Sequence, residues 1–493
     1  MSEERKYSTM SNIEMIIFIL YLVMMLGVGV VFFLRSKGSG EKDYFLGGRK
    51  MGPWVSALSA GASDMSAWSL MGLPASVYAL GMGKTWIAIG LLIGYSLSWM
   101  IEAPRLRRFT IAADDSITIP QYLTNRFLAS SSAIRILCAI LFLIAYTVYA
   151  ASSMKACGTL FNTVTGIDAK VAMYLSAAII VCYTFMGGYS AVCWTDFFQG
   201  LLMLGALMLA PLFALAAVKN GNAVFTAAQL PDGYWNFFTA DFRDIISGLG
   251  WGIGYFGMPH IIIRFMSIRS EKDLKKSRVI GIGWTTLILG FGVLAGAIGR
   301  MFLGDVSDSS IIFILMVRKL FPALISGILL SAILAAAMSS ADSQLLAASS
   351  AFSSDIYKPI FRKNASDKEM LTAGRLIVVI IAVVAVVIAS NPGSGSIMSL
   401  VEYAWGLFGA AFGPVIVLSL FWKRLNFAGA AAGIAAGGIC DILWAMFLSG
   451  TGIYEIVPAS VTGIIFTVIV TLITKKPSKA VEELFDKAVS GKD

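Results

Sequence analysis

The chain alternates between long apolar stretches and short charged loops along almost its whole length. An apolar stretch of roughly twenty residues is long enough to cross the hydrocarbon core of a bilayer as a helix. Such stretches centre near residues 23, 68, 92, 147, 178, 206, 255, 290, 332, 381, 409, 437 and 464. The pattern therefore predicts an all-α polytopic membrane protein with about thirteen transmembrane helices.

Lysine and arginine gather in every second loop of this pattern. The basic loops fall within residues 35–50, 105–135, 269–278, 358–368 and 423–424, and a basic tail occupies residues 475–493. Because basic loops stay on the cytoplasmic side, an odd number of crossings predicts an N-terminus outside and a C-terminus inside. The turn expected near Gly187 and Gly188 is uncharged, so the charge pattern gives the least support to this boundary between two spans.

The amino-acid composition also indicates a membrane protein and excludes other classes. Hydrophobic residues make up 57% of the chain and charged residues only 14%, which excludes a soluble globule. The net charge of +9 does not indicate a nucleic-acid partner, because the basic residues form short clusters between apolar segments. Residues 1–493 are expected to form a single transmembrane domain in contact with lipid. The chain has no phosphate-loop motif, so ATP-driven transport would need a partner subunit. No ATP-binding subunit is expected.

Two of the predicted spans are interrupted by glycine, proline and polar residues. Residues 59–66 carry Asp64, and residues 248–260 are rich in glycine. Hydrocarbon does not solvate a charge or freed backbone groups, so both breaks are expected to face a cavity, an ion or a substrate. They are the second and seventh spans, which predicts inverted repeats at about residues 50–218 and 243–422. The alternative is that the glycines only allow close helix packing.

Oxygen atoms suited to a hard cation gather near the first break. Ala336, Ser339 and Ser340 stand at i, i+3 and i+4 on one helix face. With carbonyls freed near Ala62 and Met65, they predict a sodium site of about five oxygens without nitrogen or sulfur donors. The alternative is that the two hydroxyls bond back to carbonyls one turn earlier.

Aromatic residues near both breaks suggest a substrate pocket. Trp68 lies one turn beyond Asp64, while Trp251, Tyr255 and Pro259 recur every four residues. The alternative is ordinary packing or placement at the membrane interface. Tyr149 is a further candidate for this pocket.

Further polar residues within the spans suggest a second cation site and a gate. Asp196, Asp342 and Ser343 are candidates to hold a second cation or to relay charge, although Asp196 is equally suited to cap a helix. Arg49 is a candidate to pair with a carboxylate at an inner gate, with snorkelling to the surface as the alternative.

Other function classes have little support in the sequence. His260 is the only histidine, so a two-histidine metalloprotease is excluded, and a serine dyad would have to use a residue such as Ser63. The sequence contains no repeated filter motif of the kind that would indicate a channel. We therefore expect a transporter and no enzyme.

Several motifs resemble the sodium/solute symporter family, and its proline branch in particular. The motifs are FLGGR at 45–49, ALSAGASDMS at 57–66, MGLP at 71–74, DSITIP at 115–120, GYFGMPH at 254–260 and LLSAILAA at 329–336. The resemblance implies a leucine-transporter-like fold with thirteen helices and a five-plus-five inverted repeat. It also implies alternating-access symport of sodium and L-proline in a bacterial cell membrane, with no cofactor. The alternatives left open are another small organic solute and a sensor without transport.

The resemblance also implies roles for individual residues. The sodium ligands would be the carbonyls of Ala62, Met65 and Ala336 and the hydroxyls of Ser339 and Ser340. Asp64 would be essential nearby, and Asp342 occupies a place where relatives often carry serine. The proline site would be lined by Ser66, Trp68, Tyr149, Trp251, Tyr255 and Pro259.

Overall fold

The computed structural model describes residues 11–35 and 41–491. Within these residues the chain is helical, with one isolated bridge between Met51 and Ile268 and no strand. The all-α class predicted from the sequence is therefore confirmed. The predicted outside location of the N-terminus concerns residues 1–10, which lie outside the described residues.

The first half of the chain contains nine helices in the described part. They are α2 (Asn12–Arg35), α3 (Glu41–Leu46), α4 (Pro53–Asp64), α5 (Leu73–Leu80), α6 (Thr85–Leu97), α7 (Ala103–Ala112), α8 (Ile119–Arg126), α9 (Ala133–Thr165) and α10 (Ala169–Lys219).

The second half continues with ten more helices among the described residues. They are α11 (Phe242–Gly250), α12 (Pro259–Ser267), α13 (Glu271–Leu303), α14 (Ile312–Leu320), α15 (Ala323–Ala351), α16 (Asp367–Ser390), α17 (Ile397–Phe421), α18 (Phe427–Phe447), α19 (Ile456–Ile473) and α20 (Lys479–Ser490).

Ten helical segments in the described part are long and apolar enough to cross a membrane. The spans expected near residues 178 and 206 form one continuous element, α10, which bends at Gly188. Gly188 has φ 62° and ψ −170°, a conformation that a residue with a side chain rarely adopts. The boundary expected near Gly187 and Gly188 is thus present as a kink at Gly188, with the segments Ala169–Cys182 and Gly188–Lys219 on its two sides.

Both predicted interruptions are present in the structure. Helix α4 ends at Asp64, Met65 has a non-helical ψ of 68°, and helical structure resumes at Trp68. The second break follows the short helix η7 (Trp251–Phe256), where Met258 is extended before Pro259 begins α12. Proline suits this first helical position because its missing N–H would have no partner there.

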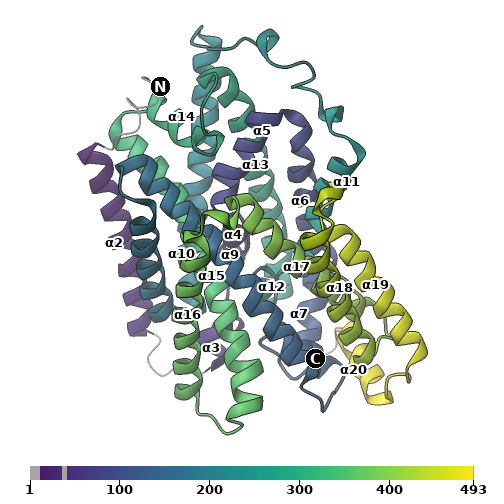
Figure 1. Cartoon of the computed structure of the whole chain (residues 1–493). Coiled ribbons are helices and arrows are strands. Elements are labelled where there is room, and N and C mark those ends of the chain that lie inside the picture. Colours follow the sequence, from purple (N-terminus) through teal and green to yellow (C-terminus); the bar gives the residue numbers. More distant parts are fainter. Residues whose placement is uncertain (1–10, 36–40, 492–493) are drawn as a thin grey trace.

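The two interrupted helices lie in the interior of the bundle. Helix α4 contacts α10, α12, α13 and α15. In Figure 1, α4, α9 and α15 occupy the middle, while α2 lies at one edge and α18 and α19 lie at the other. The breaks are therefore enclosed by protein, as freed backbone groups require.

Glycines also allow close helix contact, as the alternative interpretation of these segments proposed. A Cβ at Gly90 of α6 would lie 2.1 Å from the carbonyl oxygen of Gly248, and one at Gly94 would lie 2.1 Å from that of Gly252. Close packing and interruption therefore occur together along residues 248–260.

Candidate functional site

Three of the oxygens predicted to bind sodium come together where α15 meets the break in α4. The hydroxyl of Ser339 lies 2.9 Å from the carbonyl oxygen of Ala62 and 3.2 Å from that of Ala336. A hydroxyl has one hydrogen, so both the contact across the helices and the bond back along α15 are available to it. Met65 is fully buried, and its carbonyl accepts a weaker bond of 3.4 Å from Ser69.

Ser340 provides the clearest sign that this region suits an ion. Its hydroxyl oxygen is buried and has no hydrogen-bond partner among the described residues. A buried polar atom without a partner is costly, and a bound cation removes that cost. The donor set of carbonyl and hydroxyl oxygens fits a hard cation.

Asp64 links the sodium oxygens to the predicted substrate residues. The side chain is fully buried, and its Oδ2 accepts a hydrogen bond of 2.5 Å from the Tyr255 hydroxyl. The backbone carbonyl of Asp64 accepts bonds from Trp68 Nε1 at 3.2 Å and from the Tyr149 hydroxyl at 3.3 Å. The α4 break is therefore hydrogen-bonded to three aromatic side chains.

The aromatic residues form a connected group around the two breaks. The ring of Trp251 lies 6.4 Å from Trp68 and 6.2 Å from Trp405, and the ring of Tyr255 lies 5.1 Å from Tyr95. Sequence reasoning did not find Tyr95 and Trp405, because both lie in apolar stretches that show no interruption. Ser66 is also buried here, with its N–H 2.8 Å from the Asp64 carbonyl.

Pro259 lies at the start of α12, just beyond the second break. It lines a small cavity of about 20 Å³ together with Thr118, Phe142 and Ile263. The spacing of four residues from Tyr255 suggested a common helix face, but the chain is extended at Met258 between the two positions. Helical periodicity does not continue across such a break.

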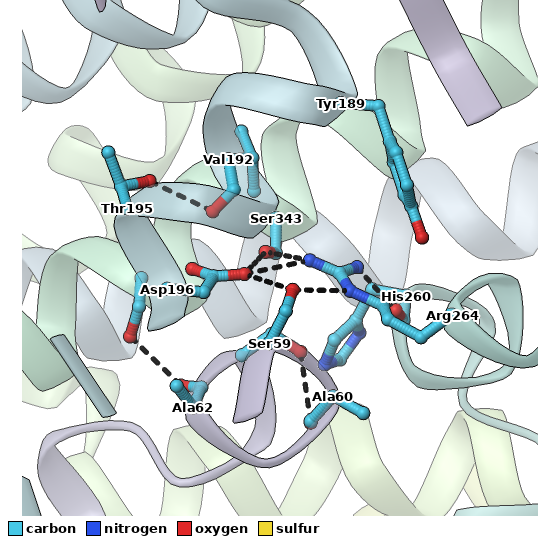
Figure 2. Close-up of polar contacts among 12 residues, drawn as sticks. Ser59, Ala60, Ala62, Tyr189, Val192, Thr195, Asp196, His260, Arg264 and Ser343 are labelled. Atoms are coloured by element: carbon cyan, nitrogen blue, oxygen red, sulfur yellow. Dashed lines mark hydrogen bonds and ion pairs between the residues drawn. The ribbon is translucent and has the colours of Figure 1, made fainter. Parts of the chain in front are cut away.

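A buried ion pair includes Asp196 of the predicted second cation site (Figure 2). Asp196 Oδ2 accepts hydrogen bonds from Arg264 Nη2 at 3.0 Å and from the hydroxyl of Ser59 at 2.7 Å. Arg264 Nη2 also donates to the Ser343 hydroxyl at 2.6 Å. Asp196 lies within α10 beyond the Gly188 kink, so it is not a helix cap.

Arg264 is a buried charged residue that sequence reasoning did not single out. It stands in an apolar run of α12, and its charge is the only signal that marked it. Its Nη1 donates to the His260 carbonyl at 2.5 Å, and its guanidinium carbon lies 5.4 Å from the ring centre of Tyr189. Asp342 is fully buried next to Ser343 in α15. A cation held at Asp196 would therefore share that carboxylate with a guanidinium.

Arg49 pairs with a carboxylate, as the gate hypothesis expected. Its Nε donates to Asp115 at 2.8 Å, and Nη2 and Nη1 donate to the carbonyls of Ser116 at 2.9 Å and Met266 at 2.5 Å. Partial burial acts to raise the pKa of Asp115, but a hydrogen bond from Lys42 and the charge of Arg49 lower it further, so the net shift is downward. Arg49 thus joins the segment before α4 to the end of α12.

Among the described residues, Ser63 and His260 do not form the hydrogen-bonded dyad that a hydrolase would need. The hydroxyl of Ser63 donates to the Ala60 carbonyl at 3.1 Å. The ring of His260 instead lies against Tyr146 at 5.8 Å and Tyr149 at 6.0 Å.

Comparison with known proteins identifies the class. The model of the sodium:solute symporter family matches residues 44–437, so the chain belongs to this family. It is therefore a multi-pass membrane transporter and not an enzyme.

Named relatives within the family are proline transporters. The osmoregulated proline transporter OpuE of Bacillus subtilis is 46% identical over 96% of this chain and 98% of its own length. The high-affinity proline transporter PutP of the same organism is 43% identical over 92% and 97%. A sodium/proline symporter of Staphylococcus aureus is 40% identical over 95% and 94%.

Solved structures share the fold. A sodium-coupled sialic acid symporter, whose outward-open structure reveals a novel sodium site, superposes with a TM-score of 0.79 at 23% identity, covering 95% of this chain and 99% of that one. The nucleobase-cation-symport-1 transporter Mhp1 superposes with a TM-score of 0.57 at 13% identity, covering 90% and 97%.

Proposed function

We propose that this protein couples inward sodium flow to uptake of L-proline by alternating access. The family is one of sodium:solute symporters, and the relatives described above are proline transporters over nearly their full lengths. Sodium is the coupling ion in this account and no cofactor takes part. The observation that carries the proposal is the contact of Ser339 in α15 with the Ala62 carbonyl at the α4 break, directly beside Asp64.

The proposed topology has thirteen crossings. The ten long segments, the two interrupted helices and the short segment Ala169–Cys182 supply them. The inverted repeats comprise about residues 50–218 and 243–422, in a leucine-transporter-like fold. The basic loops and the tail from residue 475 face the cytoplasm of a bacterium, the N-terminus lies outside, and lipid surrounds the single transmembrane domain.

The proposed sodium site comprises five oxygens. They are the carbonyls of Ala62, Met65 and Ala336 and the hydroxyls of Ser339 and Ser340. The hydrogen bond from Ser339 to Ala62 and the buried Ser340 hydroxyl support this set. On binding, sodium satisfies the Ser340 oxygen and frees the Ser339 hydrogen from its present acceptors. Sodium thereby holds α4 against α15.

The proposed proline site is lined by six residues that contact the carboxylate, the ring and the secondary amine of the substrate. Five of them lie in or beside the aromatic group around Asp64, whereas Pro259 closes the pocket from the start of α12. The six residues are Ser66, Trp68, Tyr149, Trp251, Tyr255 and Pro259.

Coupling follows from the shared position of Asp64. Its carboxylate holds Tyr255 and its carbonyl holds Trp68 and Tyr149, while Ala62 and Met65 on either side provide sodium ligands. Sodium fixes this segment in the shape that binds proline, so each ligand raises the affinity for the other. Such coupling energies are typically about 1–3 kcal/mol. At the inner end of the transport path, Arg49 holds the gate closed by its hydrogen bonds to Asp115 and to the carbonyl of Met266.

Asp196, Asp342 and Ser343 form a proposed second cation or charge-relay site. Support comes from the bonds of Asp196 and Ser343 to Arg264. Arg264 supplies positive charge to Asp196 when no ion is bound there. We infer that a second ion binds only as Arg264 gives up part of its contact with Asp196.

Uptake of labelled L-proline into proteoliposomes that contain the purified protein tests the function. An inward sodium gradient is expected to drive accumulation, whereas potassium and an inward proton gradient are not. Absence of accumulation and exchange under every gradient would contradict the proline assignment, and a panel of other small organic solutes would follow. Solute binding without any transport would instead indicate a sensor.

A further inference from the structure

Helix α20, after the last long apolar segment, has one apolar face. Val481, Phe485 and Ala488 form it at positions i, i+4 and i+7. A helix of this kind can lie on a membrane surface with its apolar face in lipid. Here the face is buried where α20 contacts α7 and α8, and only 8% of the Phe485 surface is exposed. Figure 1 shows α20 near α7, at the end of the bundle where the chain terminates. Protein, and not lipid, therefore covers this face.

Arg126 of α8 connects α20 to the helices around it. Its side chain is fully buried, and Nη2 has no hydrogen-bond partner among the described residues. The guanidinium carbon lies 5.0 Å from the ring centre of Phe485 in α20 and 5.6 Å from that of Phe109 in α7. Nη1 donates to the Val481 carbonyl at 3.5 Å, and Nε donates to the Ser419 carbonyl of α17 at 3.3 Å. Aromatic faces and carbonyls stabilise a buried guanidinium, so α20 supplies part of the environment that keeps Arg126 inside the protein.

Two further contacts hold α20 in this position. The ring of Phe485 packs edge-on against that of Phe109, with 5.3 Å between the ring centres. Lys423, just after α17, forms an ion pair with Asp486, with 2.6 Å between Nζ and Oδ2. This pair is exposed to solvent, so it adds little free energy but fixes the orientation of the helix. Helix α20 thus joins α7, α8 and the end of α17.

Helix α8 and the loop before it form one hydrogen-bonded unit, which includes the acceptors of the gate. Asn125 of α8 donates through Nδ2 to the carbonyl of Ala113 at 3.2 Å and to the hydroxyl of Ser116 at 3.0 Å. Arg49 donates to two residues of the same loop, to Asp115 at 2.8 Å and to the Ser116 carbonyl at 2.9 Å. The unit therefore contacts Arg49 through its loop and α20 through its helix.

We propose that α20 is a strut of the inner gate, which holds α8 and its loop where Asp115 and Ser116 accept hydrogen bonds from Arg49. This inference rests on the proposed function, which assigns Arg49 to that gate. Opening of the inner path separates Arg49 from its acceptors, and α8 moves more readily when α20 is not docked. Undocking of α20 therefore shifts the protein toward the inward-open state. In this account α20 controls a step of transport and does not anchor the tail in the membrane.

Ser350 provides a position from which opening of the inner path can be measured. It lines the cavity of about 20 Å³ together with Pro259, a residue of the proposed proline site, and Met266, whose carbonyl accepts from Arg49. Only 3% of its surface is exposed, and its hydroxyl has no hydrogen-bond partner in the described part of the chain. A cysteine at this position is therefore expected to react with a cytoplasmic thiol reagent only when the inner path opens.

The test is the rate at which a membrane-impermeant maleimide labels Ser350→Cys from the cytoplasmic side of inverted membrane vesicles. The same full-length chain without this substitution gives the background from the native cysteines. Adding Phe485→Ala removes the ring that α7 and Arg126 share, and it is expected to raise the labelling rate about fivefold or more, the lower end of typical coupling factors. Removal of residues 479–493 should raise the rate at least as much. Glu483→Gln, at an exposed position of α20, is the matched control and should leave the rate unchanged.

A charge exchange separates loss of docking from loss of the fold. Asp486→Lys places a second cation beside Lys423 and is expected to raise the labelling rate about two- to fivefold, as the free energy of an exposed ion pair allows. Combining it with Lys423→Asp restores an ion pair of reversed polarity and should lower the rate again. A packing defect would not be reversed in this way. If Phe485→Ala does not accumulate in the membrane, this exchange decides the question.

Equal labelling rates in the parent, in Phe485→Ala and in the shortened chain would overturn the strut. A slower rate without α20 would also overturn it, because α20 would then hold the path open. A rise in Asp486→Lys that the second substitution does not reverse would assign the effect to misfolding. Labelling requires neither proline nor uptake, so a negative result with normal sodium-driven uptake contradicts only this inference. Loss of sodium-driven proline uptake in the parent chain would instead contradict the proposed function.

Discussion

Asp64→Asn is expected to raise the sodium concentration for half-maximal proline uptake by about tenfold or more. The variant removes a buried negative charge beside the sodium oxygens and weakens the bond from the Tyr255 hydroxyl. Hydrogen bonds to charged groups contribute about 1.5–3 kcal/mol, which corresponds to roughly a ten- to hundredfold change in binding. The measurement is initial uptake into proteoliposomes over a series of sodium concentrations at fixed ionic strength.

Ser340→Thr provides the matched control. Threonine keeps the hydroxyl that lacks a partner among the described residues, so sodium activation should be nearly unchanged. Unchanged sodium activation in Asp64→Asn would remove Asp64 from the coupling mechanism. A loss in Ser340→Thr as large as in Asp64→Asn would show that packing, and not ligand chemistry, controls this region.

Arg264→Met is expected to lower the stability of the folded protein by about 3–5 kcal/mol, because it leaves the Asp196 carboxylate buried without its partner. The thermal unfolding midpoint of the detergent-purified protein, measured in choline, reports this loss. The variant should regain more stability from added sodium than the wild type does, because the freed carboxylate becomes available to an ion.

The double variant Arg264→Met, Asp196→Asn tests whether the pair itself is responsible. Removing both charges avoids the uncompensated carboxylate, so the double variant should be more stable than Arg264→Met alone. If the double variant is no more stable than the single one, the loss comes from packing around Tyr189 and Ser343 and not from the ion pair.

The interrupted helices and the position of Asp64 were predictable from the sequence. A carboxylate, glycines and proline within apolar stretches violate the rule that backbone and charge must be satisfied in hydrocarbon, and such violations mark a site. Helix periodicity then placed Ala336, Ser339 and Ser340 on one face, and the structure brings Ser339 to Ala62. Local pattern was sufficient because each of these features lies within one or two helical turns.

Other features depend on contacts between distant segments. Arg264 meets Asp196 although 68 residues separate them, and no local pattern links the two. The Nε1 of Trp405 donates a hydrogen bond of 2.8 Å to the carbonyl of Trp251. Trp405 lies in an apolar stretch without an interruption, so nothing in the local sequence marked it. Helical periodicity does not continue from Tyr255 to Pro259, since the chain is extended at Met258 between them.

The central claim is that sodium and proline stabilise each other through the segment around Asp64. The most direct test measures the dissociation constant of proline with and without sodium, and that of sodium with and without proline, on the same purified protein. We expect both constants to fall by the same factor, between about 5 and 150. Equal proline affinity in sodium and choline would contradict the account.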